Sequence, residues 1–186
     1  ENIERALEKA RGGAEGDELD EVVYEGYGPG GAAIIVEAAT NNRNRTAAEI
    51  RLFFSKNGGN FGESGCVGWL FDRKGQITGP MKGLDEESLM MSAIEAGAED
   101  VEHDGETFII TCDPMQLHEV RVALTAAKVP VKNSEMTMIA KTSTEISLAD
   151  APQLLKLMDL LEDHDDVLNV YANFEISSEV LEALEA

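Results

Sequence analysis

The sequence is poor in several residue types, and each shortage narrows what the protein can do. It has only two cysteines, Cys66 and Cys112, which excludes a disulfide-stapled domain, and their spacing fits no zinc motif. No apolar run approaches the ~20 residues that a membrane helix needs, and no signal peptide is recognisable. We therefore expect a soluble, cytoplasmic protein with no membrane partner.

Basic residues are scarce as well. The 186 residues include 15 Lys and Arg against 36 Asp and Glu, for a net charge of -21. Such a charge repels nucleic acids in general, so a nucleic-acid partner would require a local basic patch. With 43% hydrophobic residues, the chain can bury a core as one domain or two small ones.

The sequence shows no arrangement typical of an enzyme. No Ser, Cys or carboxylate pair has an evident activating partner. Residues 163–166, Asp-His-Asp-Asp, lack further ligands and are explained by an acidic turn between a helix and a strand. Residues 26–31 satisfy G-x-G-x-x-G, but they precede a predicted strand, whereas dinucleotide binding requires a helix there. We expect no enzymatic activity, no metal and no cofactor.

Hydrophobic periodicity predicts an α+β fold with two ferredoxin-like βαββαβ units, the second inserted in the first. The first unit is predicted to comprise residues 17–74 and 142–186, and the second residues 75–141. Residues 1–16 are interpreted as the end of an N-terminal helical domain and a linker. Because no N-cap residue precedes the helical pattern that starts at Ile3, we expect the sequence to begin within that helix.

Individual elements follow from apolar runs and capping residues. In the first unit, Thr46 and Glu49 form a capping-box pattern that predicts the start of a helix, and Asp150 with Pro152 predicts another. In the second unit, Asp85 and Asp113 are the predicted N-caps, and Asp104-Gly105 predicts a turn between two strands. Ser177 is the predicted N-cap of a short helix at the end of the chain. Strands are predicted near residues 22–24, 32–38, 66–71, 76–78, 101, 107–112, 135–140, 142–146 and 168–176.

The stretch from Thr40 to Thr46 is the best candidate for a site. It holds arginines and asparagines at a predicted helix entrance, where free backbone N–H groups and partial positive charge favour phosphate. Residues 41–74 carry six Lys and Arg against three acids, whereas the chain from residue 75 onward is strongly acidic. The alternative is an ordinary polar cap with solvated arginines. The candidate nucleic-acid contacts are Arg43, Arg45, Arg51, Lys56, Asn42 and Asn44, with Tyr24 and Tyr27 either as stacking surfaces or as packed rings.

Three segments together resemble the YebC/PmpR family: residues 24–31 (YEGYGPGG), 40–46 (TNNRNRT) and 58–62 (GGNFG). This family includes the mitochondrial translational activator of cytochrome oxidase subunit I. The resemblance covers essentially the whole chain and implies an N-terminal helical bundle followed by two α+β units. Members usually have a Lys-rich segment in the bundle, which is absent here. Cys66 stands where a serine is usual, and Asn41 where an aspartate is common.

The resemblance implies a DNA-binding transcriptional regulator in the cytoplasm. A second view of the family implies a translation factor or translational activator that binds ribosomal or messenger RNA at the ribosome. Both functions require a positively charged surface patch, so the charge distribution does not distinguish between them. A third hypothesis is a protein-interaction scaffold that works through the acidic second unit. The sequence does not indicate the oligomeric state.

Overall fold

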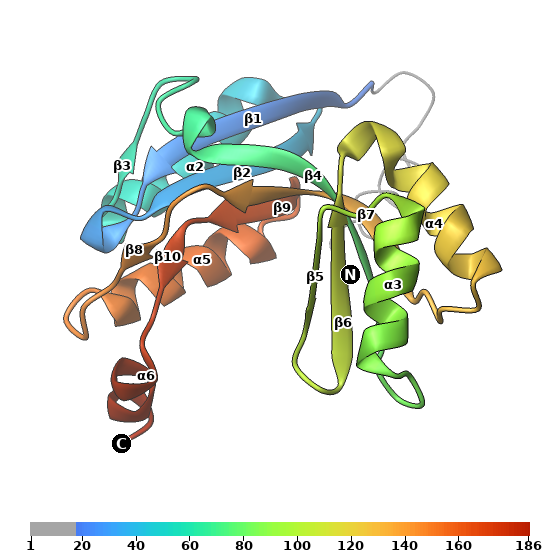
Figure 1. Cartoon of the computed structure of the whole chain (residues 1–186). Coiled ribbons are helices and arrows are strands. Elements are labelled where there is room, and N and C mark those ends of the chain that lie inside the picture. The colour runs from blue at the N-terminus through green and yellow to red at the C-terminus, as the bar shows by residue number, and fades with distance from the viewer. Residues whose placement is uncertain (1–17) are drawn as a thin grey trace. The chain divides into compact units, whose positions relative to one another are not determined.

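The computed structural model describes residues 18–186 and divides them into two compact units (Figure 1). Unit 1 contains residues 18–71 and Ala140–Ala186, and unit 2 contains Asp72–Ile139. In the chain, unit 2 therefore lies between the two parts of unit 1. The predicted end of a helical domain, residues 1–16, falls outside the described residues.

Unit 1 is built on a four-stranded sheet with the strand order β3-β1-β2-β9. A second, two-stranded parallel sheet joins β8 and β10. The elements of unit 1 are β1 (Asp20–Tyr27), η1 (Pro29–Gly31), β2 (Ala33–Thr40), α2 (Arg43–Lys56), β3 (Asn60–Phe61), η2 (Gly68–Leu70), β8 (Thr144–Glu145), α5 (Ala151–Asp163), β9 (Val167–Ala172), β10 (Phe174–Glu175) and α6 (Ser178–Glu185).

The glycine-rich stretch at residues 26–31 makes the connection between β1 and β2. These strands pair antiparallel, with Tyr27 opposite Ala33. Gly30 and Gly31 have φ values of 77° and 81°, which favour glycine because other residues meet steric strain there. The G-x-G-x-x-G pattern thus serves a turn between two strands of one sheet.

The core of unit 1 lies on one face of the sheet, under α2 and α5 (Figure 1). Alternate residues of β1 and β2 point to this face, as a period of two requires. The fully buried side chains include Ile50 and Phe54 from α2 and Leu154 and Leu157 from α5. This packing fixes the position of α2, which carries most of the predicted site.

Unit 2 follows the order βαββαβ, and its four-stranded sheet has the strand order β5-β6-β4-β7. Its core is formed around Ile77, Phe108 and Ile110 of the sheet and Val120 and Leu124 of α4. Helices α3 and α4 lie side by side (Figure 1). The elements are β4 (Phe71–Pro80), α3 (Glu86–Ala96), β5 (Asp100–His103), β6 (Thr107–Cys112), η3 (Pro114–Gln116), α4 (Leu117–Ala126) and β7 (Asn133–Ala140).

The predicted α+β class is confirmed, and the two four-stranded sheets with their helices are consistent with ferredoxin-like units. The predicted strand at 66–71 is wrong, because this segment forms turns and η2 and joins β4 only at Phe71. The N–H groups of Gly65, Val67 and Gly68 donate to the Glu25 carboxylate instead of to a neighbouring strand. A distant side chain therefore prevents the strand.

Two further details differ from the sequence prediction. The N-cap of α2 is Asn42, so Thr46 and Glu49 lie inside the helix and form no capping box. The strand predicted at 168–176 is divided at Asn173 into β9 and β10. The side-chain oxygen of Asn173 accepts the backbone N–H of Ala33 at 2.8 Å, and the backbone N–H of Asn173 donates to the Ala33 carbonyl at 3.1 Å. These bonds hold Asn173 against β2 where the two short strands meet.

Candidate nucleic-acid interface

Helix α2 starts where Asn42 supplies a cap. The Asn42 side-chain oxygen accepts the backbone N–H of Arg45 at 3.1 Å, which satisfies one of the free donors at a helix start. The Asn42 N–H in turn donates to the Thr40 hydroxyl at 2.9 Å. Arg43, Asn44 and Arg45 are therefore exposed residues of the first helical turn, and one of the N–H groups expected to hold phosphate already has a partner.

The basic residues of α2 divide between two rows of side chains. Residues four apart lie on the same side of a helix, so Arg45 and Glu49 form one row and Arg43, Ala47 and Arg51 form another. Lys56 is the last residue of the helix. One row contacts acidic and histidine side chains, and the other row faces aromatic side chains.

The row with Arg45 is held by internal partners, and we call it the paired side. The Arg45 guanidinium lies 2.9 Å from the carboxylate of Asp166, whose side chain is only 6% exposed. The same carboxylate accepts the Thr46 hydroxyl at 2.9 Å. A buried carboxylate requires a positive or donating partner, so Arg45 is committed to Asp166.

A second contact on the paired side joins Glu49 to His164, with Nε2 of the imidazole 2.6 Å from the carboxylate. The Nδ1 atom of His164 accepts the backbone N–H of Asp166 at 3.1 Å. Because Nδ1 is an acceptor there, the proton belongs on Nε2, which donates to Glu49. Phe53 packs edge-on against the imidazole at 5.9 Å. Residues 163–166 thus anchor α2, and the described residues contain no cluster suited to a metal ion.

The row with Arg43 and Arg51 faces aromatic side chains, and we call it the aromatic side. Here a surface depression of about 430 Å³ is lined by Tyr24, Arg51 and Phe61, among others. The Arg51 guanidinium lies 5.1 Å from the centre of the Phe61 ring, and Tyr24 is 5.8 Å from the same ring. Such a contact orients the guanidinium while leaving its N–H donors available.

Tyr24 is partly packed and partly accessible in this depression. Its hydroxyl donates to the carbonyl of Arg43 at 3.4 Å. Burial raises the pKa of the Tyr24 hydroxyl above its usual value, although the nearby Arg43 acts in the opposite direction. Tyr24 is therefore a neutral donor at physiological pH and fixes the start of α2 against β1.

Three of the four predicted cationic contacts have no acidic partner among residues 18–186. Arg43, Arg51 and Lys56 are exposed and form no ion pair with a described residue. Charged groups held at a surface without an internal counter-charge can bind an external anion. Arg45 is the exception among the four, because it forms an ion pair with Asp166.

Residues 62–69, which we call the Glu25 loop, are organised around one buried carboxylate. Glu25 is 5% exposed and accepts the N–H groups of Gly65, Val67 and Gly68, the second at 3.2 Å. A Cβ added at Gly68 would lie 2.8 Å from a Glu25 oxygen, so the loop cannot accommodate a larger residue there without a shift. The loop is therefore held in one conformation.

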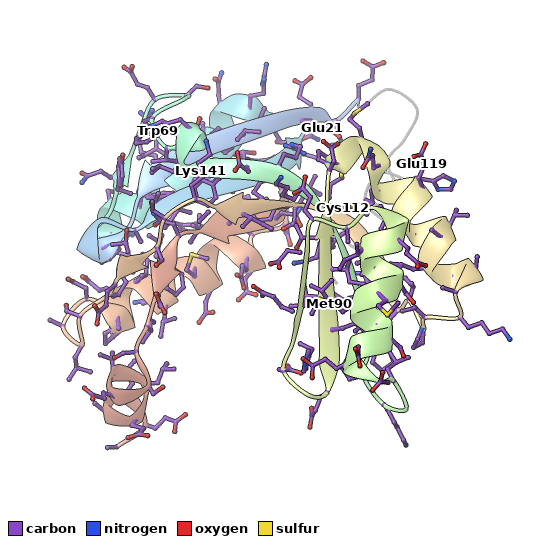
Figure 2. All side chains as sticks on the ribbon, in the orientation of Figure 1. Glu21, Trp69, Met90, Cys112, Glu119 and Lys141 are labelled. Atoms are coloured by element: carbon purple, nitrogen blue, oxygen red, sulfur yellow. The ribbon has the colours of Figure 1, made fainter. Side chains whose placement is uncertain are left out.

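The Glu25 loop positions two aromatic rings by a shared acceptor, the carbonyl of Cys66. The Trp69 indole N–H donates to it at 3.1 Å and the Tyr27 hydroxyl at 3.4 Å. Trp69 is nevertheless 66% exposed and Tyr27 37% exposed. Trp69 is labelled in Figure 2. Burial and the neighbouring Glu25 charge raise the pKa of the Cys66 thiol, which makes a nucleophilic role for this cysteine unfavourable.

Comparison with known proteins places the chain in a family. Residues 19–174 match the family described as "TACO1/YebC second and third domain". The chain belongs to this family. The predicted YebC/PmpR resemblance is thereby confirmed, and the matched domains correspond to the region that contains both units.

Relatives in the YebC family carry a regulatory name. A protein of Geobacter sulfurreducens is 50% identical over 184 residues, which are 99% of this chain and 74% of the relative. One of Citrifermentans bemidjiense is 48% identical with the same coverage. Both are named "Probable transcriptional regulatory protein". A crystal structure of a conserved hypothetical protein from Aquifex aeolicus has a TM-score of 0.82 and 47% identity, over 96% of this chain and 74% of that one.

The structure thus separates the predicted site residues of this YebC-family chain into groups. Tyr24, Arg43 and Arg51 come together on the aromatic side, while Arg45 lies on the paired side. Tyr27 belongs with the Glu25 loop, and Asn42 acts as the helix cap. Asn44 is exposed in the first turn, and Lys56 ends the helix.

Sequence reasoning missed Phe61, Glu25 and Trp69. Trp69 is the single tryptophan of the chain, and this was the only feature of the sequence that could have drawn attention to it. The segment around it was interpreted as a strand. Nothing in the local sequence marks Glu25 as buried, since it stands among exposed acids. Among residues 18–186, no helix combines the length and apolarity needed to span a membrane.

Proposed function

We propose that this YebC-family chain is a nucleic-acid-binding regulator of gene expression, acting in the cytoplasm as a DNA-binding regulator of transcription. The observation that carries the proposal is the aromatic side of α2. Arg43 and Arg51 project there without an acidic partner among the described residues, beside Tyr24 and Phe61. Guanidinium groups suit phosphate oxygens, because their N–H donors match the geometry of the anion.

The acidic surroundings favour a directed rather than a diffuse contact. The chain as a whole carries a net charge of -21, and Glu63 itself lines the depression. A polyanion should therefore approach along the arginines of the aromatic side of α2 that have no described acidic partner. The names of the relatives support regulation of transcription. The role we propose is binding without catalysis, since the side chains at this site offer no activated nucleophile or acid–base pair.

RNA is the second candidate partner, with a role in translation. Exposed aromatic rings favour it, because sequence-specific RNA recognition relies on unpaired bases stacked on aromatic side chains. Tyr27 and Trp69 provide such rings. Parallel titration with duplex DNA, single-stranded DNA and RNA distinguishes the two candidates.

The salt dependence of binding tests the proposal. Each phosphate contact contributes about 0.9 to the slope of log K against log salt for duplex DNA, and about 0.7 for a single strand. Replacing Arg43 and Arg51 by Gln is expected to reduce the slope by about 1.8 on duplex DNA or about 1.4 on a single strand. The matched control is Arg121→Gln, at an exposed position on α4 in unit 2. Binding that does not respond to salt, or an equal effect of Arg121→Gln, would contradict the proposal.

A further inference from the structure

Trp69 is an exception to the usual behaviour of large aromatic residues, which are mostly buried. Its indole is 66% exposed. It is not loose, because its N–H donates to the Cys66 carbonyl at 3.1 Å. An exposed ring that is held in place has few rotamers to lose when a partner binds, and this lowers the conformational entropy cost of binding.

The support behind Trp69 is built from backbone and a buried acid. Glu25 holds the N–H groups of Gly65, Val67 and Gly68. These bonds fix Cys66, whose carbonyl then orients both Trp69 and Tyr27. Burying a carboxylate is costly unless it accepts strong hydrogen bonds. The arrangement therefore stabilises one loop conformation, in which two rings remain accessible.

The Glu25 loop is continuous with the aromatic side of α2. Its first residues, Gly62, Glu63 and Ser64, line the same depression as Arg51 and Phe61. Its last residue is Trp69. A chain that lays its phosphates against Arg51 would therefore meet the loop next, and the loop ends in an exposed indole. Phosphate-binding cations followed by aromatic rings are the combination that binds single-stranded nucleic acid.

We propose that Trp69, with Tyr27 beside it, is a stacking platform for unpaired bases of a single-stranded nucleic acid. This inference rests on the proposed function and adds to it the strandedness of the partner and a residue that sequence reasoning missed. Glu25 is a positioning residue in this site, since it acts on the rings only through the loop. Paired bases are already stacked within a duplex, so the platform discriminates against duplex DNA.

The test uses the fluorescence of the full chain, which has one tryptophan. The probes are an oligothymidylate, the matching oligouridylate, a duplex of the same length, and an abasic strand that keeps the phosphates but lacks bases. We expect Trp69 emission to be quenched by the base-containing single strands and not by the abasic strand. The DNA and RNA strands together show whether the 2′-hydroxyl contributes.

Affinity for labelled strands, measured by fluorescence anisotropy, completes the test. Trp69→Ala is expected to weaken single-strand binding about tenfold, a typical cost for losing one stacked base, and Trp69→Phe to weaken it less. Val122→Ala, at a 54% exposed position on α4, is the control and should bind as the parent does. Glu25→Gln should reduce the quenching, because the loop that holds both rings loses its charged acceptor.

The possible results separate this inference from the proposed function. Salt-dependent binding that is equal for abasic and base-containing strands, and insensitive to Trp69→Ala, would overturn the stacking platform and leave the regulator standing. Preference for the duplex with unchanged Trp69 emission would do the same. Failure to bind any of the four probes would overturn both.

Discussion

The two sides of helix α2 carry the same kind of residue and use it differently. On the paired side, Arg45 neutralises buried Asp166, and Glu49 accepts from His164. On the aromatic side, Arg51 lies over Phe61 and has no acidic partner among the described residues. A basic cluster counted along a sequence can therefore combine a structural cation with cations available to a ligand. The arrangement of carboxylates around the helix makes the distinction.

The largest loss of stability is expected when the buried carboxylate on the paired side, that of Asp166, is removed. Asp166→Ala removes the partner of Arg45 and an acceptor of Thr46, and we expect the free energy of unfolding to fall by about 3 kcal/mol. Denaturant titration followed by Trp69 emission measures this in unit 1. The matched control is Asp165→Ala, at the exposed neighbouring position. Equal midpoints for the two variants would show that the paired side is not structural.

Glu25 is a second buried acid, and its substitution can likewise be compared with that of an exposed acid nearby. Glu25→Gln retains one carbonyl oxygen but loses the charge that strengthens three N–H donations, so we expect a loss of about 2 kcal/mol. Hydrogen exchange should become faster at Gly65, Val67 and Gly68. Glu63→Gln, on the exposed part of the loop, is the control. Unchanged protection at these amides would refute the role of Glu25.

A matched pair of arginine substitutions compares the two sides directly. Arg45→Gln should lower the free energy of unfolding by about 1 kcal/mol and leave nucleic-acid binding nearly unchanged, because Arg45 is committed to Asp166. Arg51→Gln should change stability by at most about 0.5 kcal/mol, since its ring contact is exposed. It should reduce the salt slope by about 0.7 on a single strand. The opposite pattern in denaturation and binding would exchange the roles of the two sides.

The smallest expected effect concerns the reactivity of Cys66. Its raised pKa leaves less thiolate at any pH below that pKa, and thiolate is the reactive form. Alkylation by iodoacetamide at about pH 8 should therefore be slower than that of glutathione, and Glu25→Gln should accelerate it. Mass spectrometry measures the rate, with buried Cys112 as the slower reference. A rate for Cys66 equal to that of glutathione would contradict the packed loop.

Local signals predicted several elements well. Asp85 caps α3 by accepting the N–H of Ser88 at 3.0 Å, and Ser177 caps α6 through Val180 at 3.3 Å. These contacts join residues three apart, so the pattern of the chain contains both partners. The turn at Asp104 and Gly105 lies between β5 and β6 for the same reason.

Predictions failed where a side chain from far along the chain competed for the backbone. Residues 66–71 have the apolar character of a strand, but Glu25 takes the N–H groups that a strand would pair. Thr46 and Glu49 have the spacing of a capping box, but Asn42 starts the helix earlier and frees them to bind Asp166 and His164. The contacts of Glu25 leave no trace in the sequence around residues 66–71, whereas the cap at Asn42 is a local signal four residues before Thr46.

The amino-acid sequence by itself determined the α+β class, the caps of α3 and α6, the family and the position of the basic cluster. Periodicity, capping and motif order act over a few residues, and the chain order preserves them. Only the tertiary structure decided which cations are available and which aromatic rings are exposed. Arg45 meets a carboxylate 121 residues away. Glu25 of β1 holds a loop that starts only after η1, β2, α2 and β3. The packing of the sheet and helices brings these partners together.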